Sequence, residues 1–171
     1  MSPTIEFLPV TSEAEIATVA ALAAEIWSEY YVPLIGQAQV DYMVAKFQSV
    51  EAMQEQIRSG YEYFLMRHGN EPVGYLAVQV QSAQDSLFIS KLYLHHNARG
   101  LGTGRAAMAF IEQLAWQQGV GQLWLTVNKG NSATRVYERL GFRVAEAIVM
   151  DIGNGFVMDD FRMEKSLRQP S

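Results

Sequence analysis

Three glycines stand at every second position in the segment Arg99-Gly100-Leu101-Gly102-Thr103-Gly104. Glycine leaves backbone N–H groups unshielded by side chains, and an Ala-rich segment that predicts a helix begins at the end of this motif. The N–H groups of a first helical turn and the positive end of the helix dipole attract anions. We therefore expect the segment to bind a phosphate or pyrophosphate, although the motif alone is equally typical of a connector that only turns the chain.

The segments around this motif predict the elements that would position it. An apolar run over residues 86–94 predicts a strand before it, and an apolar face over residues 107–114 predicts a helix after it. A buried strand over residues 123–127 follows. In a strand-helix-strand unit of this kind the two strands lie parallel in one sheet.

The side-chain rhythm of the first of these strands changes phase. Leu87 and Ile89 belong to one face of a period-two pattern, and Leu92 and Leu94 belong to the other. One extra residue in a ladder produces such a change, so we expect a β-bulge at Ser90-Lys91 with unpaired backbone groups. A strand that is buried on both faces is the alternative.

The chain before this unit predicts three helices and a hairpin. Ser12 and Glu15 form a capping box for a first helix that ends near Tyr30, and two amphipathic helices follow it. Strands over residues 61–67 and 72–80 then form a β-hairpin. The strand that leads to the glycine motif should pair antiparallel with the second of these strands.

The chain after the parallel unit predicts one more helix and a closing hairpin. Asn131 caps the helix, Tyr137 lies on its apolar face, and Gly141 ends it. Strands over residues 143–151 and 156–164 form the hairpin. With about seven strands, an antiparallel first half and a parallel crossover, the sequence predicts a mixed α/β fold.

Length and composition limit the function classes. A chain of 171 residues with 49% apolar residues suits one domain over 1–171. The absence of cysteine excludes disulfides, thiolate zinc sites and a cysteine nucleophile. A net charge of −5 argues against nucleic acid as a partner and would suit a cationic substrate. Because the sequence shows neither a membrane span nor a secretion signal, we expect a cytoplasmic protein that does not bind membranes.

Two motifs resemble those of one enzyme family, the GCN5-related N-acetyltransferases (GNAT). The glycine segment over residues 99–104 resembles their (Q/R)-x-x-G-x-(G/A) pyrophosphate loop. The segment from Asn128, with Asn131, Tyr137 and Gly141-Phe142, is similar to their N-x-x-N-x-x-A…Y…G-F motif, although the alanine comes one residue early. The tail over residues 155–165 resembles the PaiA-like polyamine acetyltransferase branch.

The resemblance implies a fold and a cofactor. The fold is the GNAT-type acyl-CoA N-acyltransferase fold, a mostly antiparallel sheet of about seven strands that is splayed at a central parallel pair and flanked by helices. The implied co-substrate is acetyl-CoA, with no metal. The implied partner is a small amine, and many such enzymes form homodimers.

The resemblance also implies a role for each residue of the cofactor site. Backbone groups of Leu92, Tyr93 and Leu94 would hold the pantetheine arm like an added strand. Asn131 would hydrogen-bond the pantetheine or phosphate portion, and Tyr137 would lie near the thioester sulfur. The pyrophosphate would be bound by backbone amides, with charge from two arginines, and the residues concerned are Arg99, Gly100, Leu101, Gly102, Thr103, Gly104 and Arg105.

Direct transfer from a thioester to an amine needs a neutral amine, a stabilised oxyanion and a protonated leaving thiolate. An alkylamine with a pKa near ~10.4 is mostly protonated at neutral pH, and its deprotonation costs roughly 4.6 kcal/mol. The N–H of Leu92 would stabilise the oxyanion. Tyr137 would protonate or orient the sulfur, unless it is only a core tyrosine. The sequence leaves the base open among Glu29, Tyr31, Glu62, His95, His96, Asp159 and Asp160.

Several alternatives compete with an acetyltransferase for small cationic amines such as polyamines. Residues 102–107 fit the dinucleotide pattern G-x-G-x-x-A, but no acidic ribose ligand follows about 20 residues later. A Walker A loop is excluded because no Gly-Lys-Ser/Thr follows. An acetyltransferase acting on protein N-termini or lysines stays open, as does a non-catalytic acyl-CoA-binding sensor.

Overall fold

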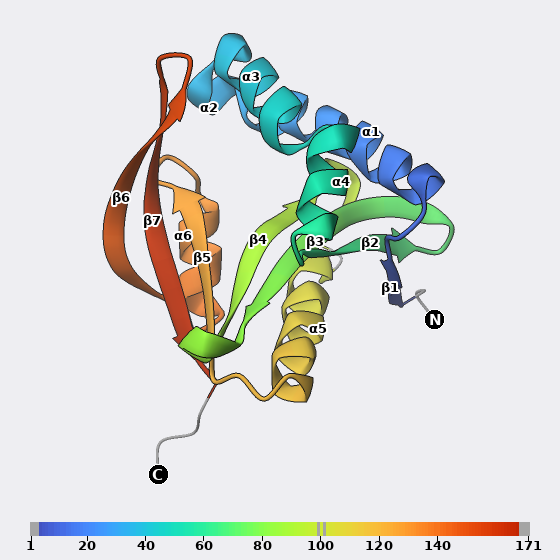
Figure 1. The fold of residues 1–171 in the computed structure, drawn as a ribbon, viewed down its shortest axis with the longest axis vertical. Helices are drawn as coiled ribbons and strands as arrows, with labels where there is room; N and C mark the ends of the chain where they lie inside the picture. Colours follow the sequence, from blue (N-terminus) through green and yellow to red (C-terminus); the bar gives the residue numbers. More distant parts are fainter. Residues whose placement is uncertain (1–3, 99, 101, 168–171) are drawn as a thin grey trace. The chain divides into compact units, whose positions relative to one another are not determined.

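The computed structural model describes residues 4–98, 100 and 102–167 (Figure 1). The chain divides into two compact units. The first unit comprises Met1–Gln79 and Lys91–Met108, and the second comprises Val80–Ser90 and Ala109–Ser171. Strand β4 (Ser86–Leu94) and helix α5 (Thr103–Gln117) each contribute to both units. A single domain over residues 1–171 stays a prediction.

Seven strands pair in the order β1-β2-β3-β4-β5-β7-β6. The registers of β1 with β2, β2 with β3, β5 with β7 and β6 with β7 are antiparallel. Strands β4 and β5 are parallel, and Ser86–Phe88 pairs with Gln122–Trp124. The predicted mixed sheet, mostly antiparallel with a central parallel pair, is confirmed.

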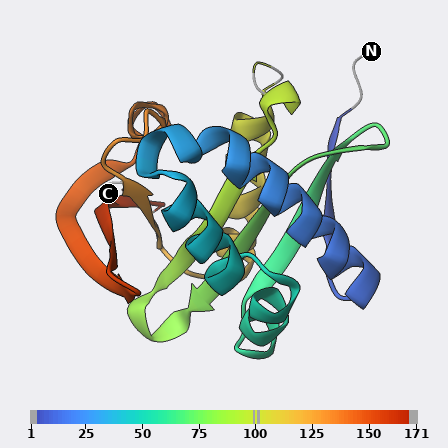
Figure 2. The same cartoon turned by 90° about the horizontal axis from the view of Figure 1, so that it is seen from above.

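The first half of the chain forms four helices and three strands. Its elements, in chain order, are β1 (Ile5–Pro9), α1 (Glu13–Tyr30), α2 (Val32–Ile35), α3 (Gln37–Phe47), α4 (Val50–Arg58), β2 (Glu62–His68) and β3 (Glu71–Gln81). The predicted capping box is present, since Ser12 Oγ accepts from the N–H of Glu15 at 3.1 Å and the Glu15 carboxylate accepts from the N–H of Ser12 at 2.8 Å. Figure 2 shows α1 passing over β2 and β3. The buried residues of α1 are Ile16, Val19, Leu22, Ala23, Ile26 and Trp27.

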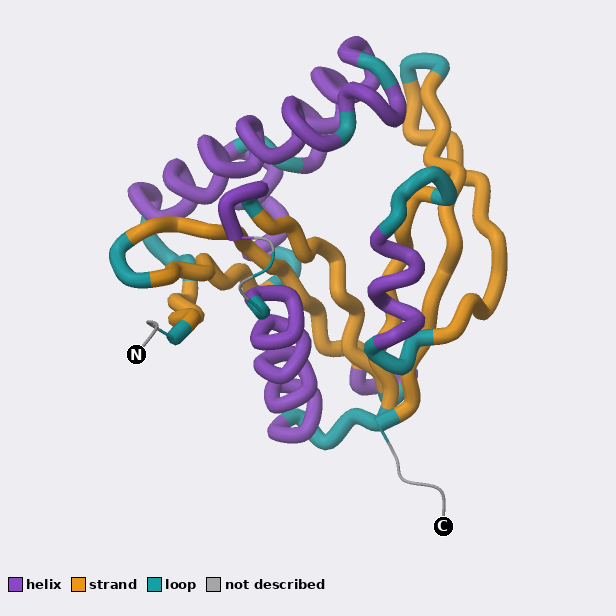
Figure 3. Tube along the Cα trace, turned by 180° about the vertical axis from the view of Figure 1, so that it is seen from behind, coloured by secondary structure: helices purple, strands orange, loops and turns teal. Residues whose placement is uncertain are grey.

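The second half of the chain contains the parallel crossover and the closing hairpin (Figure 3). Two short 3₁₀ turns, Ser82–Gln84 and His96–Ala98, lie before and after β4, and α5 follows the second turn. The remaining elements, in chain order, are β5 (Gln122–Asn128), α6 (Ala133–Arg139), β6 (Arg143–Gly153) and β7 (Phe156–Ser166). Helix α6 begins one residue later than a cap at Asn131 would give, because Ser132 occupies the cap position. Asn131 still caps the helix in chemical terms, since its Oδ1 accepts from the N–H of Ala133 at 2.8 Å.

From Leu87 to Lys91, strand β4 buries every second residue, namely Leu87, Ile89 and Lys91, whereas residues 92–94 are all half-buried. The change of phase and the bulge predicted at Ser90-Lys91 stay predictions. Within the described residues, no helix combines the length and the apolar content that crossing a membrane requires.

Candidate active site

The glycine motif owes its composition to backbone conformation. Gly100 and Gly102 have φ of +83° and +74°, in the left-handed region that other residues rarely adopt. A Cβ at either position would meet no described atom within 4 Å, so the requirement is conformational and the space beside these residues is open. Arg99 and Leu101, which are also predicted to bind the cofactor, lie outside the described residues.

Thr103 joins the glycine motif to the first turn of α5. Its side chain is buried, and its Oγ1 donates to the carbonyl oxygen of Ala98 at 3.1 Å. The N–H of Ala106 donates to the carbonyl oxygen of Gly102 at 3.0 Å, which starts the helical ladder. The earlier N–H groups of a helix have no partner within it, so this loop presents donors to an anion.

The end of β4 lies against this helix start and against β3. A Cβ on Gly104 would be 3.7 Å from Leu94 Cδ1, which brings the predicted pantetheine strand and the predicted pyrophosphate loop together. A Cβ on Gly74 would be 2.5 Å from the carbonyl oxygen of Tyr93, so only glycine permits this approach of β3 and β4. The Tyr93 ring packs edge-on against Trp27 with centroids 5.3 Å apart. The backbone of Leu92, Tyr93 and Leu94 is thus held in place.

Lys91, directly before this triplet, is a residue that the sequence analysis named only as part of a predicted bulge and gave no role in the site. It is 5% exposed, and its Nζ donates to the carbonyl oxygen of Phe47 and to the Tyr63 hydroxyl. Tyr63 in turn donates to Gln56 Oε1. Burial lowers the pKa of Lys91 to about 7 and raises that of Tyr63. Lys91 continues the alternation of Leu87 and Ile89 along the strand, and this alternation was the sequence signal that could have revealed its burial.

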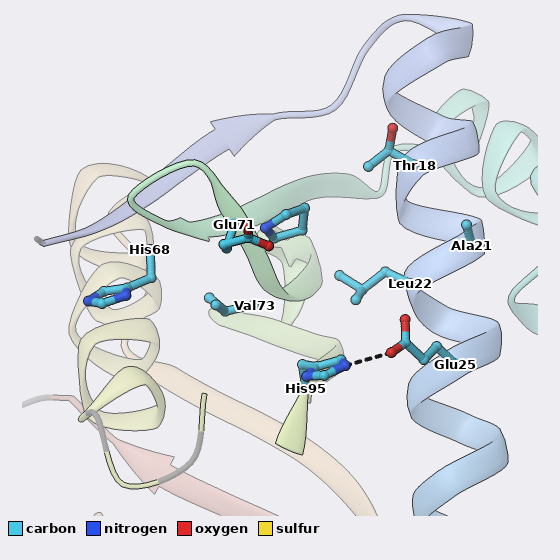
Figure 4. Close-up of a pocket in the computed structure, with 9 residues that line it drawn as sticks. Thr18, Ala21, Leu22, Glu25, His68, Glu71, Val73 and His95 are labelled. Carbon is cyan, nitrogen blue, oxygen red and sulfur yellow. Dashed lines mark hydrogen bonds and ion pairs between the residues drawn. The ribbon is translucent and has the colours of Figure 1, made fainter. Parts of the chain in front are cut away.

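A pocket of about 610 Å³ lies within the first unit, between α1 and the β2–β3 hairpin (Figure 4). Its lining residues are Thr18, Ala21, Leu22, Glu25, His68, Glu71, Pro72, Val73 and His95. His95 Nε2 lies 2.7 Å from Glu25 Oε1, and this pair links the end of β4 to α1. In the described ranges, no three His, Cys, Asp or Glu side chains gather in a way that could hold a metal ion.

The groups that the sequence left open as bases now differ in their surroundings. Glu29 pairs with His96 at 2.8 Å, and Asp159 pairs with Lys129 at 2.7 Å. Both carboxylates are about half exposed, with side-chain exposures of 49% and 53%. Glu62 is exposed, and the ring of Tyr31 stacks on Trp27 with centroids 4.3 Å apart. These groups are surface ion pairs, an exposed carboxylate and a packed ring.

Asp160 differs from the other candidate bases because it is a buried carboxylate, 6% exposed. It lies on β7, opposite Asn128 of β5 and Ile148 of β6. Burial raises the pKa of Asp160 to about 6, and the neighbouring charge of Asp159 adds to this effect. The Thr126 hydroxyl, which hydrogen-bonds the carboxylate, and the charge of Lys129 act in the opposite direction.

Tyr137 and Asn131 belong to the second unit. Tyr137 is half-buried on α6, and its ring meets Phe142 edge-on with centroids 5.7 Å apart. The N–H of Phe142 donates to the carbonyl oxygen of Tyr137 at 3.0 Å, so the Gly141-Phe142 turn fixes the end of the helix. Asn131 is buried. Their roles toward a cofactor stay predictions.

Comparison with known proteins identifies a family whose model this chain matches. Residues 31–166 match the family model described as the acetyltransferase (GNAT) domain. An uncharacterized N-acetyltransferase of Mycobacterium tuberculosis is 32% identical over 97 residues, which are 54% of this chain and 62% of the relative. The match therefore spans less than two thirds of the relative's length.

Two solved structures share the fold at low sequence identity. The PaiA N-acetyltransferase of Thermoplasma acidophilum, in complex with coenzyme A, has a TM-score of 0.77 at 20% identity over 95% of this chain and 99% of that chain. A spermidine N-acetyltransferase chimera from Vibrio cholerae has a TM-score of 0.67 at 14% identity over 95% of each chain.

Proposed function

Because the chain belongs to the GNAT acetyltransferase family, we propose that it transfers an acetyl group from acetyl-CoA to a primary amine. The observation that carries the proposal is the glycine loop. Gly100 and Gly102 at positive φ lead into α5, and Thr103 closes the loop on Ala98. Open space beside both glycines and the N-terminal end of α5 suit the pyrophosphate of coenzyme A.

The chain's own residues supply binding and electrostatics in this proposal. The backbone of Leu92, Tyr93 and Leu94 binds the pantetheine arm, and the N–H of Leu92 stabilises the developing oxyanion. Asn131 hydrogen-bonds the same arm or the phosphates. Tyr137 donates a proton to the departing sulfur or orients it. The bound thioester supplies the acetyl group, which the amine attacks directly.

The proposed acceptor is a small cationic amine, with polyamines as the first class to test. The net charge of −5 supports a cationic substrate, and one structural relative is a spermidine N-acetyltransferase. An acetyltransferase for protein N-termini or lysine side chains is the alternative within the same chemistry. We further propose that the protein is cytoplasmic and forms a homodimer. Light scattering of the purified protein would test the homodimer.

A free-thiol release assay with acetyl-CoA tests the proposal. The panel contains spermidine, spermine, putrescine, aminoglycosides, amino acids, and peptides that end in lysine or alanine. We expect turnover of polyamines. Turnover of peptides alone would overturn the polyamine assignment and retain the reaction. Binding of acetyl-CoA without thiol release from any amine would indicate a non-catalytic sensor.

A further inference from the structure

We infer that Asp160 is the group that accepts the proton of the acceptor ammonium, an assignment that rests on the proposed function. The sequence left seven candidates for this role. The structure separates them, because Glu29 and Asp159 form half-exposed ion pairs whereas Asp160 is buried with a hydroxyl partner, Thr126.

The place of Asp160 in the sheet supports the assignment. It lies opposite Asn128, the last residue of β5, and the segment that leads to Tyr137 begins there. Strands β4 and β5 are parallel, so the polypeptide leaves both strands in the same direction. In open sheets with parallel strands, ligands bind outside the carboxyl ends of those strands. Asp160 thus lies beside the carboxyl end of β5, the second strand of the parallel pair.

The charges around Asp160 suit a base that works near neutral pH. Its pKa of about 6 keeps it mostly ionised at pH 7, while it remains a stronger base than an exposed aspartate. The charged groups acting on it are Asp159, which raises the pKa, and Lys129, which lowers it. A buried carboxylate also attracts a cationic amine more strongly than a solvated one does.

The proposed step balances in atoms and charge. The ammonium gives one proton to the Asp160 carboxylate, and the neutral nitrogen then attacks the thioester carbonyl carbon. The C–S bond breaks as the amide forms, and the second proton of the nitrogen passes to the thiolate, directly or through Tyr137. Asp160 returns its proton to water, so the net products are the acetamide, the free thiol and one proton.

The first test compares Asp160→Asn with Asp159→Asn on two acceptors of the same shape. One is the best amine found for the wild type, and the other is its fluorinated analogue, chosen to be neutral at pH 7. We expect Asp160→Asn to lower kcat/KM about 100-fold for the protonated amine, and much less for the neutral one, because a positioned base contributes on this scale. Equal losses on both acceptors would assign Asp160 a structural role and overturn the inference.

The pH profile gives a second test that does not need the Asp160 variant to fold. In the wild type we expect kcat/KM for the amine to fall on the acid side with a pKa near the value of about 6 of Asp160. Thr126→Val removes a hydrogen bond that lowers this pKa, so the acid limb should move to higher pH. Asp159→Asn removes a like charge, so the limb should move to lower pH. An acid limb that both variants leave in place would contradict the assignment.

A binding control separates this inference from the proposed function. Calorimetric titration with coenzyme A should give the same Kd, within about twofold, for the wild type and Asp160→Asn. If the wild type acetylates no amine, the proposed function fails and the inference falls with it. If the wild type is active and Asp160→Asn equals it, only the inference fails.

Discussion

Thr103 Oγ1 donates a hydrogen bond to the carbonyl oxygen of Ala98 at 3.1 Å, and this bond closes the glycine loop from within. Both residues are buried, at 1% and 0% exposure, so water does not replace the bond if it is lost. The loop's shape therefore depends on one hydroxyl, and a single substitution can test that dependence.

We expect Thr103→Val to weaken both the fold and cofactor binding. Among the described residues, it leaves the buried Ala98 carbonyl oxygen without its donor, which costs about 1–3 kcal/mol of unfolding free energy. Urea unfolding measures this loss, and titration with coenzyme A measures the change in Kd. Thr103→Ser retains the hydroxyl and should keep most of the affinity. Wild-type affinity in Thr103→Val would show that the bond does not shape the binding site.

Gly102→Ala should raise the KM for acetyl-CoA severalfold. Its φ of +74° costs a residue with a Cβ about 1–2 kcal/mol, and the strain is relieved by moving the loop. Gly60→Ala is the matched control, because Gly60 has φ of +100° with open space around it and lies outside the loop. Both variants should lose stability, but only Gly102→Ala should change the KM. An equal KM change in both would refute a specific role for the loop.

Tyr137→Phe should lower kcat about 100-fold at most and leave the KM for the amine within about twofold. This is the low end of the range for a positioned acid, because a thiol with a pKa of about 8.5 leaves readily. The ring contact with Phe142 survives the change, so the fold should be retained. Stopped-flow thiol release measures the rate. An unchanged kcat would reduce Tyr137 to a packing residue.

Lys91→Met should remove a pH dependence of stability. The pKa of Lys91 is about 7 in the fold and near 10.5 when unfolded, so between these values the unfolded chain binds more protons. The unfolding free energy therefore rises with pH across this window, and the lysine destabilises the fold below about pH 7. The Phe47 carbonyl oxygen keeps a partner after the substitution, since Gln56 Nε2 also donates to it at 3.2 Å.

Urea unfolding between pH 6 and pH 10 checks this prediction. The wild type should gain stability across the series relative to Lys91→Met. Lys46→Met, which removes an exposed lysine on α3, is the control for the loss of one positive charge. Parallel curves for the wild type and Lys91→Met would contradict the buried lysine's role.

The sequence by itself determined the features that depend on neighbouring residues. The capping box at Ser12 and Glu15, the glycine loop before α5 and the turn between β6 and β7 all arise within a few residues. The strand-helix-strand spacing around the glycine loop likewise predicted the parallel pair of β4 and β5. The cap of α6 was displaced by one residue, because Ser132 intervenes between Asn131 and the helix.

Only the tertiary structure decided which titratable groups are buried and which are paired. Lys91 reaches Phe47 across 44 residues of chain, and His95 meets Glu25 across 70. Asp159 and Asp160 are adjacent in sequence, yet one forms an exposed ion pair and the other is buried between β5 and β6. Solvation and charge pairing set a pKa, and both depend on contacts between residues that are far apart in the sequence. Local patterns therefore specified the glycine loop, whereas the choice of Asp160 as the proposed base required the fold.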